Sequence, residues 1–315
     1  MATKTKGLRP FGPKPMPVRL LIGLCLLLIT FSARAEWMDW RSGVGITVSE
    51  DNNVNIASRG RDKLSDESVQ ARVRIARRYA LSGSQYSGAF LGAEADLSRR
   101  EYNDFDGLSG WRGGATLSYQ QKLGLGPTVP RLSLRASAHY EAPDDRYREH
   151  WDYRLSATGI FPLGPRVTAL ARGRLVEQQG QEWLTSSPQL SSNVFDQSRW
   201  ELGGELRVRV QPWARLRVRA EYLDGEFDAF CGPGSAGRLN QVAGLSGVKA
   251  VAFDSVFNSC RWLVEGDGWR YETGLEFALS PSQALELHWI EHDIRVDTSQ
   301  SYERRVFGLE WRYAL

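Results

Sequence analysis

The chain has 315 residues, of which 42% are hydrophobic, and its mean hydropathy is −0.39. It carries 40 basic and 37 acidic residues, and the net charge of +3 is too small to indicate a general affinity for nucleic acids. After residue 35 there is no run of even twelve apolar residues, which excludes a helical membrane protein. Such a composition fits a soluble protein, or a chain in which apolar and polar residues alternate along membrane-spanning strands.

The first 35 residues have the features of a secretory signal peptide. An apolar core at 20–31 follows a basic leader that contains Lys4, Lys6, Arg9, Lys14 and Arg19. Ala33 and Ala35 then supply small residues before a cleavage site at Glu36. We therefore predict a signal peptide at 1–35 and one mature domain at 36–315, with a retained membrane anchor as the alternative.

The mature chain is dominated by segments of about ten residues in which apolar and polar residues alternate, as they do along half-buried or membrane-spanning strands. In 198–210, for example, Trp200 and Leu206 lie on one face and Glu201 and Arg207 on the other. Interpreted in this way, the sequence predicts twelve strands, at 40–49, 68–80, 84–99, 110–123, 130–142, 151–161, 167–177, 198–210, 215–227, 268–279, 284–295 and 303–315.

The connections between these strands alternate in length. The short ones fall at 81–83, 124–129, 162–166, 211–214 and 280–283, whereas those in between are mostly longer and more acidic. This alternation is typical of an outer-membrane barrel with an even number of strands, which has short periplasmic turns and long extracellular loops. The alternative, a soluble β-sandwich, has no reason to alternate short and long connections. Aromatic residues at strand ends suit a membrane–water interface, as for Trp111, Trp151, Trp200, Trp269 and Trp311. The predicted fold is all-β: an antiparallel up-and-down transmembrane β-barrel of about twelve strands.

The last predicted strand carries the most specific pattern. Phe307, Leu309, Trp311, Tyr313 and Leu315 form one unbroken apolar face. In this pattern the chain resembles the bacterial outer-membrane β-barrel superfamily, whose last strand carries it as an assembly signal. Leu315 departs from the Phe that most often ends those chains. The resemblance implies a place in the outer membrane of a Gram-negative cell, in contact with its lipid.

If the apolar faces meet lipid, the opposite faces line a lumen rich in arginine. Strand direction predicts that this lumen is basic toward the short turns and more acidic toward the long loops. The arginines expected to line the pore and contact anions are Arg72, Arg74, Arg131, Arg135, Arg172, Arg174, Arg207, Arg209, Arg217 and Arg219. The lumen and strand number are similar to those of small porins for acidic oligosaccharides, such as the oligogalacturonate channels. That likeness implies that these arginines contact the solute.

Three functions compete on this sequence. The first is a channel that favours anionic solutes or acidic oligosaccharides; a lumen filled by paired Arg and Glu is the structural alternative to an open passage. The second is a non-conducting barrel that acts in polymer export or assembly, or binds a periplasmic or surface protein. The third is an outer-membrane hydrolase, for which we considered His139, His150, His288 and His292. No nucleophilic serine is paired with a histidine in the pattern that catalysis needs. No metal site and no cofactor are expected.

Cys231 and Cys260 are the cysteines of the mature chain, and an oxidising compartment favours a disulfide between them. They enclose most of the longest connection, the segment from 230 to 268. We predict that this segment folds over the mouth of the barrel or into it, with a position on the outer surface as the alternative.

Overall fold

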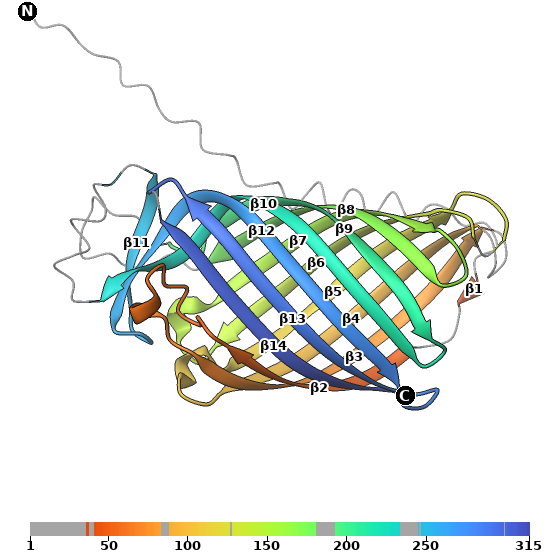
Figure 1. The fold of residues 1–315 in the computed structure, drawn as a ribbon, viewed down its shortest axis with the longest axis horizontal. Helices are drawn as coiled ribbons and strands as arrows, with labels where there is room; N and C mark the ends of the chain where they lie inside the picture. The colour runs from red at the N-terminus through yellow and green to blue at the C-terminus, as the bar shows by residue number, and fades with distance from the viewer. Residues whose placement is uncertain are drawn as a thin grey trace, which may run out of the picture.

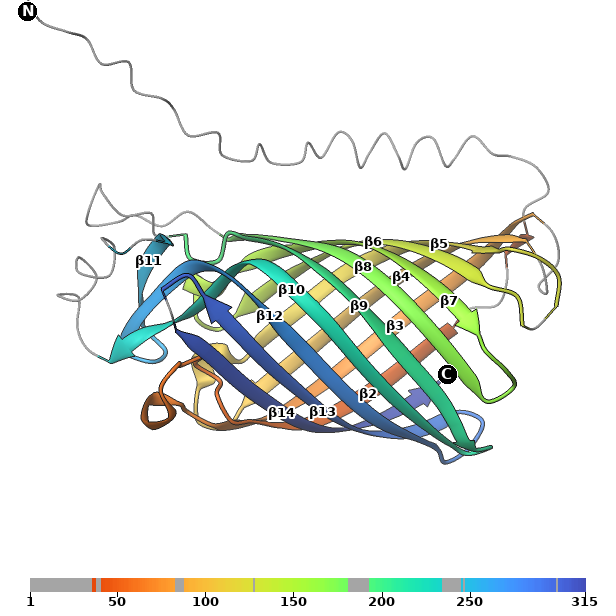
Figure 2. The ribbon, with the colours of Figure 1, turned by 45° about the horizontal axis from the view of Figure 1, so that its top comes forward.

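The computed structural model describes residues 36–37, 41–82, 88–126, 128–180, 193–233, 245, 247–298 and 300–315. The predicted signal peptide at 1–35 lies outside the described residues. Twelve long strands of this part of the chain form a closed antiparallel barrel (Figures 1 and 2). They are β2 (Arg41–Asp51), β3 (Asp66–Ser82), β4 (Ala89–Tyr102), β5 (Gly110–Lys122), β6 (Arg131–Pro143), β7 (His150–Pro162), β8 (Val167–Gly180), β9 (Gln197–Gln211), β10 (Ala214–Pro233), β12 (Ser259–Ala278), β13 (Gln283–Val296) and β14 (Ser301–Ala314).

Closure comes from the last strand pairing with the first long one. Leu309 of β14 lies opposite Val48 of β2, and each other barrel strand pairs with its neighbours in chain order. Two further strands extend the sheet: β1 (Glu36–Trp37) on β3, and β11 (Val248–Asp254) on β12. Three single-turn 3-10 helices lie in the long loops, at Gly60–Asp62, Asp106–Leu108 and Arg146–Arg148. The predicted fold class is confirmed.

Because apolar and polar residues alternate along each strand, the barrel has an apolar outer face and a polar inner face. Large apolar side chains on the outer face are about half exposed, such as Leu97 at 52% and Leu202 at 59%, whereas Glu221 on the inner face is only 2% exposed. This is the reverse of a soluble protein, and it matches a wall that contacts lipid. None of the described helices is long and apolar enough to cross a membrane.

Aromatic side chains gather on the outer wall near both ends of the barrel. Toward the long loops, ring contacts join Trp200 to Tyr222 and Tyr222 to Trp269. Toward the short turns, Trp311 stacks on Tyr313. Two such girdles mark the two membrane–water interfaces.

The strand ends differ from the prediction mainly at one place. The strand predicted at 215–227 continues to Pro233, the one predicted at 268–279 begins at Ser259, and β11 was not expected. Figure 1 shows this extension beyond the long-loop end of the barrel. Residues 259–264 are all buried, so both faces of this part of β12 are covered. A strand covered on both faces loses the period-two pattern, and the sequence therefore reads as a loop.

Candidate functional site

The inner wall is an ionic network. Six of the ten predicted pore-lining arginines pair with carboxylates there: Arg72, Arg172, Arg174, Arg207, Arg217 and Arg219. Several pairs bridge strands that are not neighbours in the sheet, as in Arg217 Nη2 of β10 and Glu286 Oε1 of β13, 2.5 Å apart. Side chains reach across in this way only on the concave face of a closed barrel, so this face is the lumen.

Shared carboxylates explain how a dense group of arginines is tolerated. Glu272 forms ion pairs with two arginines: Oε1 lies 2.6 Å from Arg217 Nη2, and Oε2 lies 2.8 Å from Arg219 Nη1. Glu205 likewise forms ion pairs with Arg219 and Arg207. Arg219 lies opposite both glutamates in the strand register. The sequence indicated the cluster of like charges on β9 and β10 and left their pairing with glutamates as an alternative; the strand register identifies Glu205 and Glu272 as the partners.

In the half of the lumen toward the long loops, carboxylates form ion pairs with arginines, so the acidic side chains predicted there do not stand alone. Three ion pairs lie here, with nitrogen–oxygen distances of 3.4 Å for Arg112 and Glu141, 2.5 Å for Arg154 and Asp152, and 2.6 Å for Arg174 and Glu201. The reason is that each carboxylate here lies beside an arginine on the same or an adjacent strand.

Four of the predicted arginines differ from the other six. Among the residues that the structure describes, the side chains of Arg74, Arg131, Arg135 and Arg209 form no ion pair and no hydrogen bond. Their positions on β3, β6 and β9 place them at mid-height or toward the short turns. Positive charge not offset by a protein carboxylate therefore accumulates in the periplasmic half of the lumen.

The extended hairpin forms a cap over the other end. The cap consists of 226–233 of β10, β11, the turn at 255–258 and 259–266 of β12. On one of its sides, Trp262 is 1% exposed and donates from Nε1 to Tyr302 Oη at 3.1 Å. The Phe230 N–H donates to the Ile56 carbonyl at 3.1 Å. This side of the cap is thereby fixed to the β2–β3 loop and to β14.

The other side of the cap meets the remaining long loops. Leu263 packs on Val194 of the β8–β9 loop, and the Phe257 ring lies 4.9 Å from Phe105 of the β4–β5 loop. Ser255 donates to Asp145 of the β6–β7 loop at 2.8 Å. Because the cap is held from both sides of the barrel, its described residues lie across the mouth, as predicted; residues 234–244 and 246 of the predicted segment lie outside the described residues.

A buried ionic cluster joins the cap to the β6–β7 loop. Arg148 Nη2 lies 2.6 Å from Asp254 Oδ2, and Arg261 contacts both Asp254 and Asp228. Burial by itself raises the pKa of Asp254, but the charges of Arg148 and Arg261 outweigh it and hold that pKa below its ordinary value. The Arg148 guanidinium also lies over the Phe257 ring, at 5.3 Å from its centroid. This cluster, which we call the latch, remains charged at neutral pH.

The predicted disulfide between Cys231 and Cys260 is present and joins β10 to β12 within the cap. The two cysteines are 29 residues apart in the sequence, and the bond between them reduces the number of conformations that the cap can adopt relative to the reduced chain.

The four histidines lie in different surroundings. His139 Nε2 is 3.0 Å from Asp96 Oδ1, and His150 Nδ1 is 2.8 Å from the Arg148 carbonyl. His292 lies between Arg270 and Arg304 in the register, on the lumen side, whereas Asp293 lies on the opposite face. Among the described residues no serine hydroxyl is hydrogen-bonded to a histidine, and no group of three His, Cys, Asp or Glu side chains could hold a metal ion.

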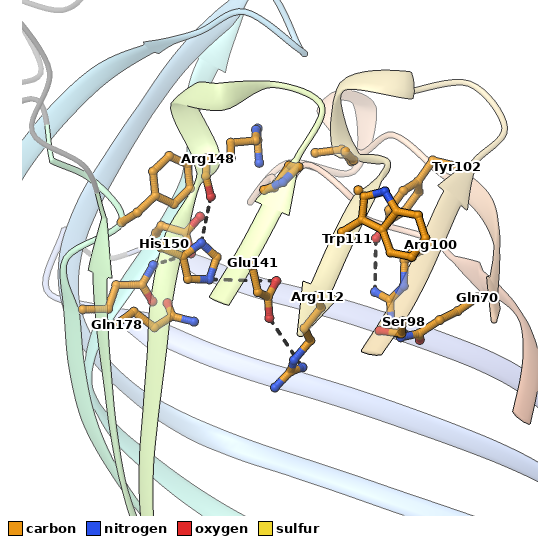
Figure 3. A pocket seen from close by; sticks show the side chains of 16 residues that line it. Gln70, Ser98, Arg100, Tyr102, Trp111, Arg112, Glu141, Arg148, His150 and Gln178 are labelled. Carbon is orange, nitrogen blue, oxygen red and sulfur yellow. Dashed lines mark hydrogen bonds and ion pairs between the residues drawn. The ribbon is translucent and has the colours of Figure 1, made fainter. Parts of the chain in front are cut away.

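A cavity of about 270 Å³ lies between the cap and the lumen wall. Figure 3 shows His150, Glu141 and Arg112 in a row on one side of it, with Gln178 beside His150. On the other side, Arg100 donates to Gln70 at 2.8 Å. Sequence reasoning did not single out this cavity, because its walls come from strands far apart in the chain.

Comparison with protein-family models and with curated proteins finds no match. Among solved structures, the COG4313 outer membrane channel from Pseudomonas putida F1 is similar at a TM-score of 0.47 and 13% identity, over 88% of this chain and 97% of that one. The NanC porin has a TM-score of 0.47 and 7% identity, over 86% and 100%. The KdgM porin in complex with disordered oligogalacturonate has a TM-score of 0.44 and 8% identity, over 87% of this chain and 99% of that one. At these identities no residue's role transfers to this chain.

The barrel's own geometry carries the assignment. Its strands close without an edge, its outer wall is apolar between two aromatic girdles, and its charges face an enclosed interior. The chain folds as a closed twelve-stranded antiparallel β-barrel with the apolar outer wall and charged interior of a membrane-spanning barrel.

Proposed function

We propose that this barrel is an outer-membrane channel that favours anionic solutes. The observation that carries the proposal is the set of four arginines, Arg74, Arg131, Arg135 and Arg209, whose charge no described carboxylate offsets directly. Charged side chains that line a pore set its ion preference, and a guanidinium presents a planar fork suited to carboxylate, sulfate or phosphate. The same four side chains are the ones available to an acidic oligosaccharide.

The six paired arginines have a different part in this proposal. Their carboxylate partners fix them in place, so they shape the lumen and contribute little net charge. Selection therefore occurs in the periplasmic half, and the cap limits entry at the other end.

Reversal potentials in planar bilayers under a KCl gradient test this proposal. The unmodified protein should prefer chloride, and the quadruple variant with Arg74, Arg131, Arg135 and Arg209 changed to Gln should lose most of that preference. Arg305→Gln is the matched control, because Arg305 lies on the outer wall with its side chain 55% exposed. Cation preference in the unmodified protein would overturn the proposal.

The cap gives a specific reason to keep a second function in view. The described part of the cap contacts all five other long loops and lies across this end of the barrel. If no current appears even after the cap is released, the barrel does not conduct. It then acts in polymer export or assembly, or in binding a partner protein.

A further inference from the structure

Arg100 differs from the other arginines that line the cavity below the cap. It lies on β4, and its side chain is exposed. Its guanidinium donates from Nη2 to Gln70 Oε1 at 2.8 Å and from Nη1 to Tyr102 Oη at 3.4 Å. Both acceptors are uncharged, and among the described residues no carboxylate forms an ion pair with Arg100. Its charge is therefore available to a ligand in the cavity.

The neighbours of Arg100 hold its guanidinium in place without offsetting its charge. Gln70 Nε2 donates to Ser98 Oγ at 3.0 Å, so the oxygen of the same amide faces Arg100. Ser98 is only 3% exposed and anchors this chain of hydrogen bonds in the wall. Gln70 also lies opposite Arg100 in the register of β3 and β4, so the barrel itself sets the arrangement. A side chain that is already held loses less entropy when a ligand binds.

The hydrogen-bonding groups that remain around Arg100 are donors. A guanidinium has five N–H groups and no acceptor, and the two hydrogen bonds to Gln70 and Tyr102 leave the others available among the described residues. The Tyr102 hydroxyl accepts from Arg100, so its own hydrogen can still be donated. Several donors around a positive charge suit a carboxylate, which only accepts and which matches the planar fork of an arginine.

Glu141 is the carboxylate of the lumen wall that lines this cavity, and Arg112 separates it from Arg100. Arg112 lies opposite Ser98 on β4 and opposite Glu141 on β6. Its guanidinium is 3.4 Å from the Glu141 carboxylate. An anion bound at Arg100 therefore has a second guanidinium, and not a carboxylate, on the neighbouring strand.

The latch adds no net charge to the cavity. Arg148 and Asp228 line the cavity from this side. In the latch, Arg148 contacts Asp254 at 2.6 Å, and Asp228 contacts Arg261. Two arginines thus face two aspartates. Arg100 contributes positive charge that no described carboxylate offsets.

We propose that Arg100, Gln70 and Tyr102 form a binding site for the carboxylate of a small acidic solute, and we call it the outer anion site. The carboxylate accepts from the Arg100 guanidinium and from the Tyr102 hydroxyl. The rest of the solute occupies the cavity of about 270 Å³, close to the small end of ligand sites, roughly 300 Å³. This proposal deepens the channel function and rests on it, because a site at the cap end serves passage only if the barrel conducts. An acidic oligosaccharide would then meet unpaired arginine charge at both ends of the lumen.

Saturation-transfer NMR on the full protein in detergent tests the outer anion site, with D-glucuronate as the probe and D-glucose as its uncharged counterpart. The experiment uses the quadruple variant with Arg74, Arg131, Arg135 and Arg209 changed to Gln, so that the periplasmic half of the lumen does not contribute. This background should fold, because those side chains form no ion pair or hydrogen bond among the described residues. It should bind glucuronate at least about tenfold more tightly than glucose, the effect of hydrogen bonds to a charged group.

Two further substitutions in this background should remove that difference. Arg100→Gln removes the charge and should weaken glucuronate binding about tenfold or more. Gln70→Glu places a carboxylate beside Arg100 and should exclude the carboxylate of the ligand. Arg99→Gln is the matched control, because Arg99 is the adjacent residue on β4 and pairs on the outer wall with Glu101 and Asp144. It should leave glucuronate binding unchanged.

Equal binding of glucuronate and glucose, or unchanged glucuronate binding in Arg100→Gln, would overturn the proposal. An equal loss in Arg99→Gln would also overturn it, because the effect would then not belong to the cavity. In the otherwise unmodified protein, Arg100→Gln should also lower the amount of glucuronate bound at saturation, as measured by equilibrium dialysis. These measurements need no ion current. The outer anion site can therefore fail while reversal potentials still show anion preference, and the channel function can fail while glucuronate still binds.

Discussion

At the scale of single residues, the lumen depends on carboxylates that each serve more than one arginine. Glu272 is 8% exposed and lies between Arg217 and Arg219. Without it, two guanidinium groups on one strand would face each other in a confined space. A hydrogen bond to a charged group contributes about 1.5–3 kcal/mol, more than a neutral one. Lumenal glutamates therefore stabilise the barrel and also cancel charge that solutes would otherwise meet.

Glu272→Gln tests both roles. We expect the free energy of unfolding to fall by about 1–3 kcal/mol, because the amide leaves Arg217 and Arg219 without their shared charge. Anion preference should rise at the same time. Denaturant unfolding followed by tryptophan fluorescence and reversal potentials measure the two effects. Glu50→Gln, at an exposed position on the outer face of β2, should change neither; equal effects would contradict the assignment.

At the scale of elements, the cap is a continuation of the barrel wall. β10 and β12 are 20 residues each, and their register runs on past the girdle to Pro233 and Ser259. Gly225 lies on this path with φ +141°, a backbone conformation that favours glycine. The strand pair can bend there, which lets the extension lie across the mouth instead of projecting from it. The latch and the disulfide then hold the bent hairpin.

Asp254→Asn tests the latch. Loss of this buried charge leaves Arg148 and Arg261 close together without one of their counter-charges, so the cap should detach from the β6–β7 loop. We expect a higher single-channel conductance or a larger open fraction in planar bilayers. Asp144→Asn is the control, since Asp144 forms an exposed pair with Arg99 at the same rim. An unchanged conductance in Asp254→Asn would show that the latch does not limit passage.

At the scale of the whole molecule, the barrel reverses the usual arrangement of a folded domain. Leucines such as Leu206 lie on the outer wall at 42% exposure, and carboxylates such as Glu205 lie inside at 6%. This arrangement is stable because lipid covers the outside and each of the twelve barrel strands has two neighbours. The position of a side chain along the membrane normal then sets the cost of adding a charge to it.

Leu206→Arg, near the middle of β9, should lower the free energy of unfolding in lipid by about 2–4 kcal/mol. Leu279→Arg lies at the short-turn interface, where its side chain is 58% exposed, and should cost only about 0–1 kcal/mol. Denaturant titrations of the protein folded into vesicles provide the measurement. Equal losses of stability for the two substitutions would show that the cost of a charge on the outer wall does not depend on its depth in the membrane.

The sequence alone determined the barrel, because three local features can be recognised without knowing which residues are in contact. They are the two-residue period, the alternation of short and long loops, and the aromatic residues at strand ends. The sequence also indicated the disulfide, and it predicted a lumenal face for the ten arginines. The tertiary structure decided which arginines are paired, since Arg219 meets Glu272 only through the β10–β12 register. It also decided the cap and the cavity, whose residues come together from distant strands. A strand such as 259–264, covered on both faces, carries no periodic signal from which the sequence could predict it.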